Sequence, residues 1–155
     1  MFGELSSDEI EEVLKIQLIG RLGLHADGTT YVVPISYAYD GESIYGHTWE
    51  GMKIDMMRKN PAVCFETDHL ENMGNWKSVI CWGEFKEITD EEGKKEAIQK
   101  LMERPLPQIV SDTVKISPTW PFAPDENKDV EGILYKVELN KKTGRYERKT
   151  EHRNA

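Results

Sequence analysis

The segment from His47 to Lys53 carries the clearest chemical signal in the sequence. It joins a β-type run to a helix predicted over Met52–Asn60, so Lys53 falls in the first helical turn. Unpaired N–H groups and the positive end of the helix dipole favour a bound anion there. A lysine at this position has the wrong sign for the dipole, and a bound phosphate would reverse that mismatch. The alternative is that Glu50 and Asp55 simply neutralise Lys53.

The strand predicted just upstream, over Thr30–Tyr39, has one bulky and one shallow face, because its odd positions from 31 onward are all large and its even ones small. Proline removes a ladder donor, so Pro34 should lie at a sheet edge or beside a ligand. Two interpretations stay open. The segment is either a plain edge strand with its bulky face in the core, or a shelf on which Pro34 and Ser36 receive a planar ring. In the second case, free backbone groups of the strand face the polar edge of that ring.

Other chemical motifs are missing from the sequence. The four histidines lack metal-ligand spacing, so no metal site is predicted. Cys64 and Cys81 lie in separate apolar runs and are expected to be buried, reduced thiols. Glycine-rich phosphate loops, the nucleophile-elbow motif and the zinc-protease motif do not occur. With 28 acidic residues, spacing alone selects no catalytic carboxylate pair.

Composition limits the partners. The 155 residues carry a formal charge of −8 with a pI near 5.1, which argues against nucleic acid or an anionic membrane surface as partner. No apolar run approaches the roughly 20 residues that span a bilayer. The N-terminus lacks a secretory signal pattern, so a cytoplasmic protein is expected. We predict one domain over residues 1–145 and a polar C-terminal tail over 146–155.

The elements that must position these residues are mostly strands. Ser6 begins an amphipathic helix, and Thr89-Asp90-Glu91-Glu92 begins another that ends at Pro105. Tight turns are predicted at Asp27-Gly28 and Asp40-Gly41, and a polar loop over His69–Asn75. These features predict an antiparallel barrel with helices packed outside. Its six strands are expected over Ile19–Ala26, Thr30–Tyr39, Ser43–His47, Ala62–Asp68, Ser78–Ile88 and Gly132–Leu139.

Together these residues resemble the pyridoxamine 5′-phosphate oxidase-related FMN-binding split barrels, most closely the nitroimidazole-resistance-type branch. The resemblance covers Ile19–Ile88, and its specificity comes from the order and spacing of its pieces rather than from any one of them. The matching pieces are Ile19-Gly20-Arg21-Leu22, Val33-Pro34-Ile35-Ser36-Tyr37, Asp40-Gly41, His47-Thr48, Gly51-Met52-Lys53, Asn60-Pro61-Ala62-Val63-Cys64-Phe65, and Trp76-Lys77-Ser78-Val79 ahead of Gly83.

The resemblance implies a mainly β fold, a six-stranded antiparallel split β-barrel, with FMN held at the interface of a homodimer. Lys53 would bind the FMN phosphate, and Arg21 would be either a second cation or a surface ion-pair residue. Trp76 and the residues after it would reach the cofactor from the partner subunit, although Trp76 could instead anchor a loop in the core. The implied cofactor-binding residues are Arg21, Pro34, Ile35, Ser36, Tyr37, His47, Thr48, Gly51, Met52, Lys53, Trp76, Lys77, Ser78 and Val79.

Departures from the family pattern limit the activity. The chain has Met52-Lys53 where true pyridoxamine phosphate oxidases have an Arg-Lys pair, and His152-Arg153 lacks the context of their C-terminal signature. The expected activity is therefore flavin-dependent reduction of a small electron-poor acceptor, with His47 as the one catalytic candidate, either a proton donor or simply a lining residue. Alternatives are a non-catalytic FMN- or haem-binding protein, or a barrel that holds a deazaflavin. Trp120 and Phe122, in the loop over Pro118–Asp129, would either cover the flavin or pack within the loop.

Overall fold

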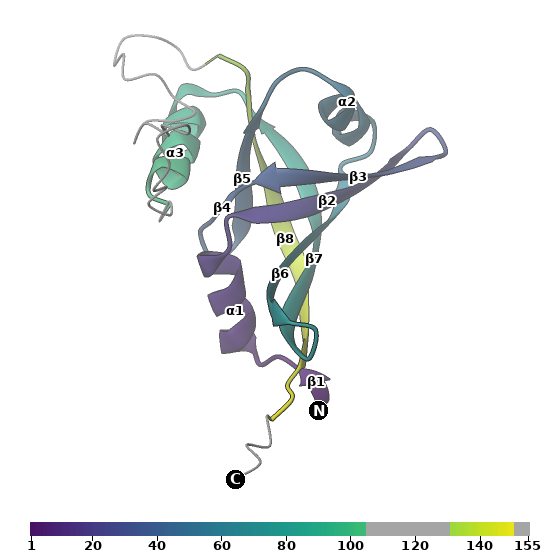
Figure 1. The fold of residues 1–155 in the computed structure, drawn as a ribbon. Helices are drawn as coiled ribbons and strands as arrows, with labels where there is room; N and C mark the ends of the chain where they lie inside the picture. Colours follow the sequence, from purple (N-terminus) through teal and green to yellow (C-terminus); the bar gives the residue numbers. More distant parts are fainter. Residues whose placement is uncertain (105–130, 151–155) are drawn as a thin grey trace, which may run out of the picture.

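A computed structural model describes residues 1–104 and 131–150 of the chain (Figure 1). The predictions for Pro105, Pro118–Asp129, Trp120, Phe122 and His152-Arg153 lie outside the described residues. The described part contains α1 (Ser7–Ile16), α2 (Met52–Lys59) and α3 (Glu91–Met102), together with β1 (Phe2–Glu4), β2 (Ile19–Ala26), β3 (Thr29–Ser36), β4 (Ala38–Tyr39), β5 (Ser43–Thr48), β6 (Ala62–Asn72), β7 (Asn75–Ile88) and β8 (Ile133–Glu147).

The strands form one antiparallel sheet that curls on itself. Its order is β3-β2-β6-β7-β8-β5-β4, with β1 added beside β8. β3 and β4 stand at opposite ends of this order, yet only Tyr37 separates them along the chain. The sheet must therefore bend until its two ends approach each other, which makes an open, split barrel. The mainly β split-barrel prediction is confirmed, although the sheet has eight strands rather than six.

One of the extra strands arises at Tyr37, where the predicted continuous strand over Thr30–Tyr39 is wrong. The Tyr37 N–H donates to the Leu18 carbonyl at 3.1 Å, and its hydroxyl donates to the Leu14 carbonyl at 2.8 Å. Its ring lies edge-on to Phe65, with centroids 4.8 Å apart. These contacts hold Tyr37 in the core, so the chain leaves β2 and turns to pair with β5. The alternation of large and small residues continues through Tyr37, so the sequence pattern does not reveal the bend.

The other differences lie at the distal end of the sheet. The predicted loop over His69–Asn75 is instead a continuation of β6 and β7, closed by a short turn in which the Asn72 carboxamide accepts from Gly74 N–H at 2.9 Å. β8 runs on past its predicted end at Leu139 to Glu147 and pairs with both β7 and β1. These strand ends consist mainly of polar residues, so they lack the apolar alternation that predicts a strand.

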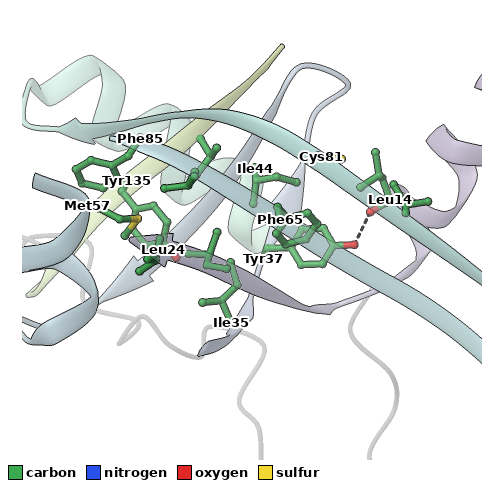
Figure 2. Packing of buried hydrophobic residues seen from close by; sticks show 14 of the residues in the cluster. Leu14, Leu24, Ile35, Tyr37, Ile44, Met57, Phe65, Cys81, Phe85 and Tyr135 are labelled. Carbon is green, nitrogen blue, oxygen red and sulfur yellow. Dashed lines mark hydrogen bonds between the residues drawn. The ribbon is translucent and has the colours of Figure 1, made fainter. Parts of the chain in front are cut away.

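Buried side chains from all parts of the curled sheet meet in one main core (Figure 2). Phe65, Tyr135 and Leu14 are almost fully buried within it. Cys81 is buried too, and burial raises the pKa of its thiol to about 12, so it is a packing residue as predicted. Cys64 is only half-buried, and neither cysteine is in a disulfide. A smaller cluster, which includes Ala97 and Leu101, seats α3 against β4, β5 and β8.

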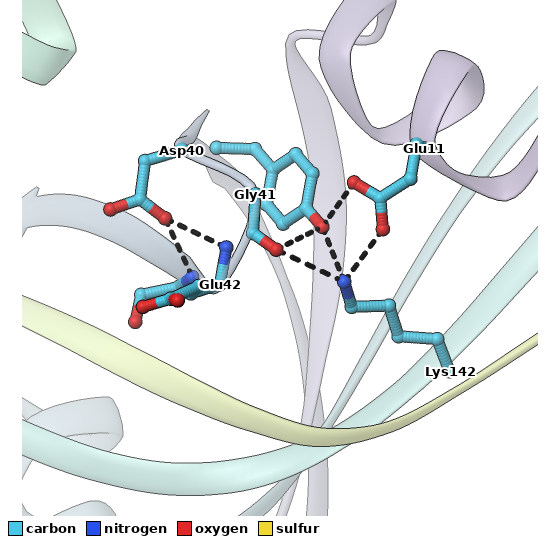
Figure 3. Close-up of polar contacts among 7 residues, drawn as sticks. Glu11, Asp40, Gly41, Glu42 and Lys142 are labelled. Carbon is cyan, nitrogen blue, oxygen red and sulfur yellow. Dashed lines mark hydrogen bonds and ion pairs between the residues drawn. The ribbon is translucent and has the colours of Figure 1, made fainter. Parts of the chain in front are cut away.

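A polar cluster fastens α1 to the sheet (Figure 3). Lys142 of β8 donates to Glu11 of α1 at 2.7 Å and to the Gly41 carbonyl at 3.2 Å. The Tyr39 hydroxyl donates to Glu11 at 2.6 Å. Burial opposes the ionisation of Glu11, but the hydrogen bonds from Lys142 and Tyr39 outweigh it and lower its pKa. The cluster therefore holds α1, which supplies the Leu14 partner of Tyr37, in a single position.

Candidate functional site

The N-terminus of α2 is uncapped, unlike those of the other two helices. Ser6 caps α1 and Asp90 caps α3 through their side chains, whereas the N-cap of α2 is Gly51, which makes no side-chain hydrogen bond. The first intrahelical bond runs from Asp55 N–H to the Gly51 carbonyl at 3.1 Å, so the N–H groups before it lack helical acceptors. An anion is the natural partner for such groups.

Lys53 lies in this first turn without a carboxylate partner in the part of the chain that the structure describes. The alternative in which Glu50 and Asp55 neutralise it is wrong. Glu50 is bound by Arg58, with two N–O distances of 2.9 and 3.0 Å, and Asp55 is exposed. Lys53 itself is half-buried, and loss of hydration lowers its pKa. A half-buried ammonium beside uncapped N–H groups is suited to a phosphate.

The β3 segment places Pro34 at the sheet edge, as predicted. β3 pairs only with β2, where Pro34 faces Arg21, so the missing N–H costs no ladder bond. The bulky face packs on the core, with Ile35 at 6% exposure, while Val32 on the other face is 65% exposed. The plain-edge-strand interpretation is thus confirmed for the bulky face. The shallow face is open, and its use as a shelf for a ring stays a prediction.

The barrel split brings this strand towards the predicted phosphate site. Ala38 pairs with Tyr45 of β5; Ser36 lies two residues before Ala38 in the chain, and His47 lies two residues after Tyr45. We call Ser36, Tyr37 and His47 the split junction. From there β5 leads through Thr48 directly to the N-terminus of α2 (Figure 1). One chain therefore arranges Pro34, Ile35, Ser36, Tyr37, His47, Thr48, Gly51, Met52 and Lys53 along one continuous path.

His47 is held by the backbone at this junction. Its Nε2 lies 2.6 Å from the Glu131 carbonyl oxygen, and because a carbonyl only accepts, Nε2 carries the proton and donates it. The ring also contacts Trp49 edge-on, with centroids 5.5 Å apart. Gly132 packs so closely that a Cβ there would lie 2.7 Å from the Thr48 carbonyl oxygen. A proton-donor role for His47 would have to use its other ring nitrogen, and the geometry favours a lining role.

Arg104 is a residue of the split junction that the sequence reasoning missed. Its Nη1 donates to the Ser36 hydroxyl and, at 3.5 Å, to the Tyr37 carbonyl, and its Nε donates to the Leu101 carbonyl at 2.7 Å. It is half-buried, and loss of hydration lowers its pKa. No motif marks it, because it follows the end of α3, 68 residues from Ser36.

Arg21 has the ion-pair arrangement rather than that of a free cation. Its Nη1 lies 3.3 Å from Glu66 and 3.3 Å from Asp68. The Ser78 hydroxyl donates to Glu66 at 3.3 Å, so these polar groups form one network on the outer face of the sheet. Burial and the nearby Asp68 raise the pKa of Glu66, and Arg21 opposes them. Because two carboxylates already offset its charge, Arg21 is poorly suited to bind a phosphate held by Lys53 of the same chain.

Trp76, Lys77, Ser78 and Val79 lie far from Lys53 in the same chain. The chain emerges from α2 at Pro61, whose carbonyl accepts from Phe85 N–H at 2.8 Å, and Trp76 precedes Phe85 by nine positions. Nine residues of extended strand span about 30 Å. Figure 1 shows the β6–β7 turn at the end of the molecule near β1, with α2 at the opposite end. Trp76 donates through Nε1 to Glu147 at 3.0 Å, and Val79 is buried in the core.

The outer face of the sheet exposes several apolar side chains. Ile19 and Val32 are 52% and 65% exposed, and Ile80 and Trp82 on β7 are 37% and 38% exposed. A shallow hollow of about 440 Å³ lies between Trp82, Cys64 and the β2–β3 hairpin. Among the described residues, no cluster of His, Cys, Asp or Glu could hold a metal ion. No helix among them is long and apolar enough to cross a membrane.

Comparison with known proteins agrees with this architecture. The family model described as pyridoxamine 5′-phosphate oxidase matches residues 6–146. The chain belongs to this family. The match to the pyridoxamine 5′-phosphate oxidase family runs from the Ser6 cap of α1 into the last residues of β8, so it includes Tyr37, Lys53 and Arg104. A 34% identity over 89 residues links the chain to the uncharacterized protein RA0666 of Rhizobium meliloti (strain 1021), covering 57% of this chain and 59% of that protein.

Solved structures of similar shape include flavin-binding proteins. A FAD-binding protein of Mesorhizobium loti is 27% identical, with a TM-score of 0.70 over 96% of this chain and 98% of that chain. A candidate 5-nitroimidazole antibiotic resistance protein of Bacteroides thetaiotaomicron is 23% identical, with a TM-score of 0.70 over 94% of this chain and 87% of that chain. At that identity the second likeness shows the fold alone, shared over most of both chains.

Proposed function

We propose that this protein is an FMN-dependent oxidoreductase that works as a homodimer and reduces a small, electron-poor acceptor. The observation that carries the proposal is Lys53, a half-buried cation without a carboxylate partner among the described residues, beside the uncapped N-terminus of α2. A phosphate monoester satisfies both features at once. FMN ends in such a group, next to a ring that suits the shallow face of β3.

The similar proteins support a flavin as the ligand. The Mesorhizobium loti protein binds FAD and resembles this chain over nearly its full length at 27% identity. The Bacteroides thetaiotaomicron protein, a candidate for 5-nitroimidazole resistance, shares the fold and suggests a nitro-compound acceptor. We propose FMN rather than FAD because Lys53 and the α2 terminus together fit a terminal phosphate.

Each residue then has a binding or positioning role. Lys53 and the N–H groups that follow Gly51 bind the phosphate, while Met52 lies beside it and Thr48 lies along the ribityl chain. Pro34, Ile35, Ser36 and Tyr37 line the ring through their backbone and the shallow face of β3. His47, fixed by its bond to Glu131, completes the wall of the ring site. When bound, the flavin supplies hydride or electron transfer, so the protein's contribution is binding, orientation and electrostatics.

The homodimer is part of this proposal, and the separation of the two sets of predicted residues supports it. Residues 76–79 lie at the start of β7, whereas Lys53 lies in α2 at the opposite end of the molecule, which favours contact of each set with a different part of a shared site (Figure 1). A second copy would bring its own set to the first copy's Lys53, so the site is complete only in the dimer. The exposed Ile80 and Trp82 supply an apolar surface for such contact. A native mass or sedimentation measurement tests it, and a monomer with bound FMN would contradict it.

Vitamin B6 oxidation is not proposed, despite the family name. Met52 stands where the true oxidases have an arginine before the lysine, and this removes one of their phosphate-binding charges. Reduction of a small neutral acceptor does not require that charge.

The proposal is tested with purified protein and a visible spectrum. Titration with FMN should give a saturable, perturbed flavin spectrum, while a Soret band would indicate haem instead. The FMN-loaded protein should then be reduced by NADH or NADPH and reoxidised faster by a nitroaromatic compound than by air. If FMN does not bind, the cofactor assignment is wrong. If it binds but is neither reduced nor reoxidised in this way, the protein is a flavin binder rather than a reductase.

A further inference from the structure

The guanidinium of Arg104 combines partial burial with neutral partners. Its hydrogen bonds go to the hydroxyl of Ser36 and to two backbone carbonyls, those of Tyr37 and Leu101. The adjacent carboxylate, Glu103, is exposed and accepts from Gln99 at 2.8 Å. Within the described residues no carboxylate pairs with Arg104. Burial lowers the pKa of this arginine, because nothing negative offsets its loss of hydration.

A partly buried guanidinium without a carboxylate partner is stabilised when an anion binds to it. Guanidinium has five N–H donors in a planar fork, and the bonds above use only the Nε and Nη1 groups. The Nη2 group has no partner among the described residues. Partners such as Ser36 and Tyr37 hold the fork in place without cancelling its charge, so the arrangement positions a charge for a ligand.

We propose that Arg104 contacts the N1–C2=O2 edge of the bound flavin and stabilises the reduced cofactor. This inference rests on the proposed function and adds a residue to the same site. Two electrons from the donor and one proton taken up at N5 leave a reduced flavin with one negative charge shared by N1 and O2. That pair of acceptors matches the guanidinium fork. Because Arg104 is bound to Ser36 and Tyr37, it lies at the strand that lines the ring, away from the phosphate end at Lys53.

The test is the reduction potential of bound FMN in Arg104→Gln, Arg104→Lys and a matched control, Lys100→Gln. Lys100 lies in the last turn of α3, four residues before Arg104, and carries the same charge, so its variant corrects for net charge. Potentials are measured by reductive titration with dithionite against a reference dye, and FMN affinities by titration of the oxidised cofactor. Thermal unfolding of each apo variant checks that it folds.

In Arg104→Gln we expect the ratio of affinities for reduced over oxidised FMN to fall at least tenfold, a potential about 30 mV lower. Oxidised FMN should bind within about threefold of wild type, Arg104→Lys should recover part of the loss, and Lys100→Gln should change little. An unchanged potential in a folded, FMN-bearing Arg104→Gln protein would overturn the proposal. An equal loss of affinity for oxidised and reduced FMN would also overturn it, because it would indicate a purely structural role for Arg104.

Two further outcomes are separable. An unchanged potential with a raised KM for an anionic acceptor would assign Arg104 to the substrate and overturn its flavin contact. Failure of the wild-type protein to bind FMN would remove the proposed function and this inference with it. Sulfite gives an independent optical readout, because it adds to N5 and likewise leaves a negative charge at N1. Arg104→Gln should weaken that adduct by the same factor as it weakens the reduced state.

Discussion

Replacing Lys53 by methionine removes the charge from the start of α2 while keeping an unbranched apolar side chain of similar length. A charge-assisted hydrogen bond to phosphate contributes about 1.5–3 kcal/mol. This corresponds to roughly 10- to 150-fold in Kd. Because Lys53 is half-buried, its bond to the phosphate is screened less than a surface pair, so we expect the upper part of that range. The N–H groups of α2 remain, and binding should be weakened rather than abolished.

The assay is fluorescence titration of FMN and, in parallel, of riboflavin, which lacks the phosphate. Wild-type protein should prefer FMN, and Lys53→Met should remove most of that preference while leaving riboflavin affinity nearly unchanged. Lys59→Met is the matched control on the same helix, because Lys59 is exposed and already paired with Asp27 at 2.7 Å. Equal losses for FMN and riboflavin in Lys53→Met, or no loss for either, would refute a phosphate role for Lys53.

Three further predictions concern the fold and the assembly. In Gly46→Ala the new Cβ would lie 2.4 Å from the ring of Tyr135, so urea unfolding should show a loss of about 1–3 kcal/mol. The pKa of Glu11 is lowered in the folded protein, so its ionised form stabilises the fold. This stabilisation is present above pH 4.5, the ordinary pKa, and is lost as the pH falls through the lower folded-state pKa. Glu11→Gln should therefore unfold more easily at pH 7, with the difference shrinking towards pH 3 in urea titrations. Ile80→Lys places a charge on the exposed apolar face, and sedimentation should then show monomer with unchanged circular dichroism.

Local signals in the sequence were enough for several elements. The Asp27-Gly28 turn and the strand before it were predicted with the correct bounds, and both residues have the positive φ values, 51° and 75°, of a tight hairpin turn. Ser6 was predicted as a helix cap, and it forms a complete capping box with Glu9. Each of these features depends on residues within one turn or one hairpin, so neighbours in sequence determine them.

Features that depend on distant contacts were missed. The bend at Tyr37 depends on the Leu14 and Leu18 carbonyls and on Phe65, which the pattern of β3 and β4 does not contain. The same limit applies to the site. Lys53 could be proposed because a helix N-terminus is a local feature, whereas Arg104 reaches Ser36 only through the packing of α3 on the sheet.

The distribution of charge bears on how an acidic chain would hold the proposed anionic cofactor. Its formal charge is −8, and carboxylates bind Arg21, Arg58 and Lys142. In the described part of the chain, Lys53 and Arg104 have no carboxylate partner. Both are partly buried, so each has lost part of the hydration that stabilises its charge. Lys53 lies beside uncapped N–H groups, and Arg104 is bound to a hydroxyl and two backbone carbonyls. On the function proposed above, a bound anion would recover part of the free energy lost in burying each cation, the FMN phosphate at Lys53 and the reduced ring at Arg104.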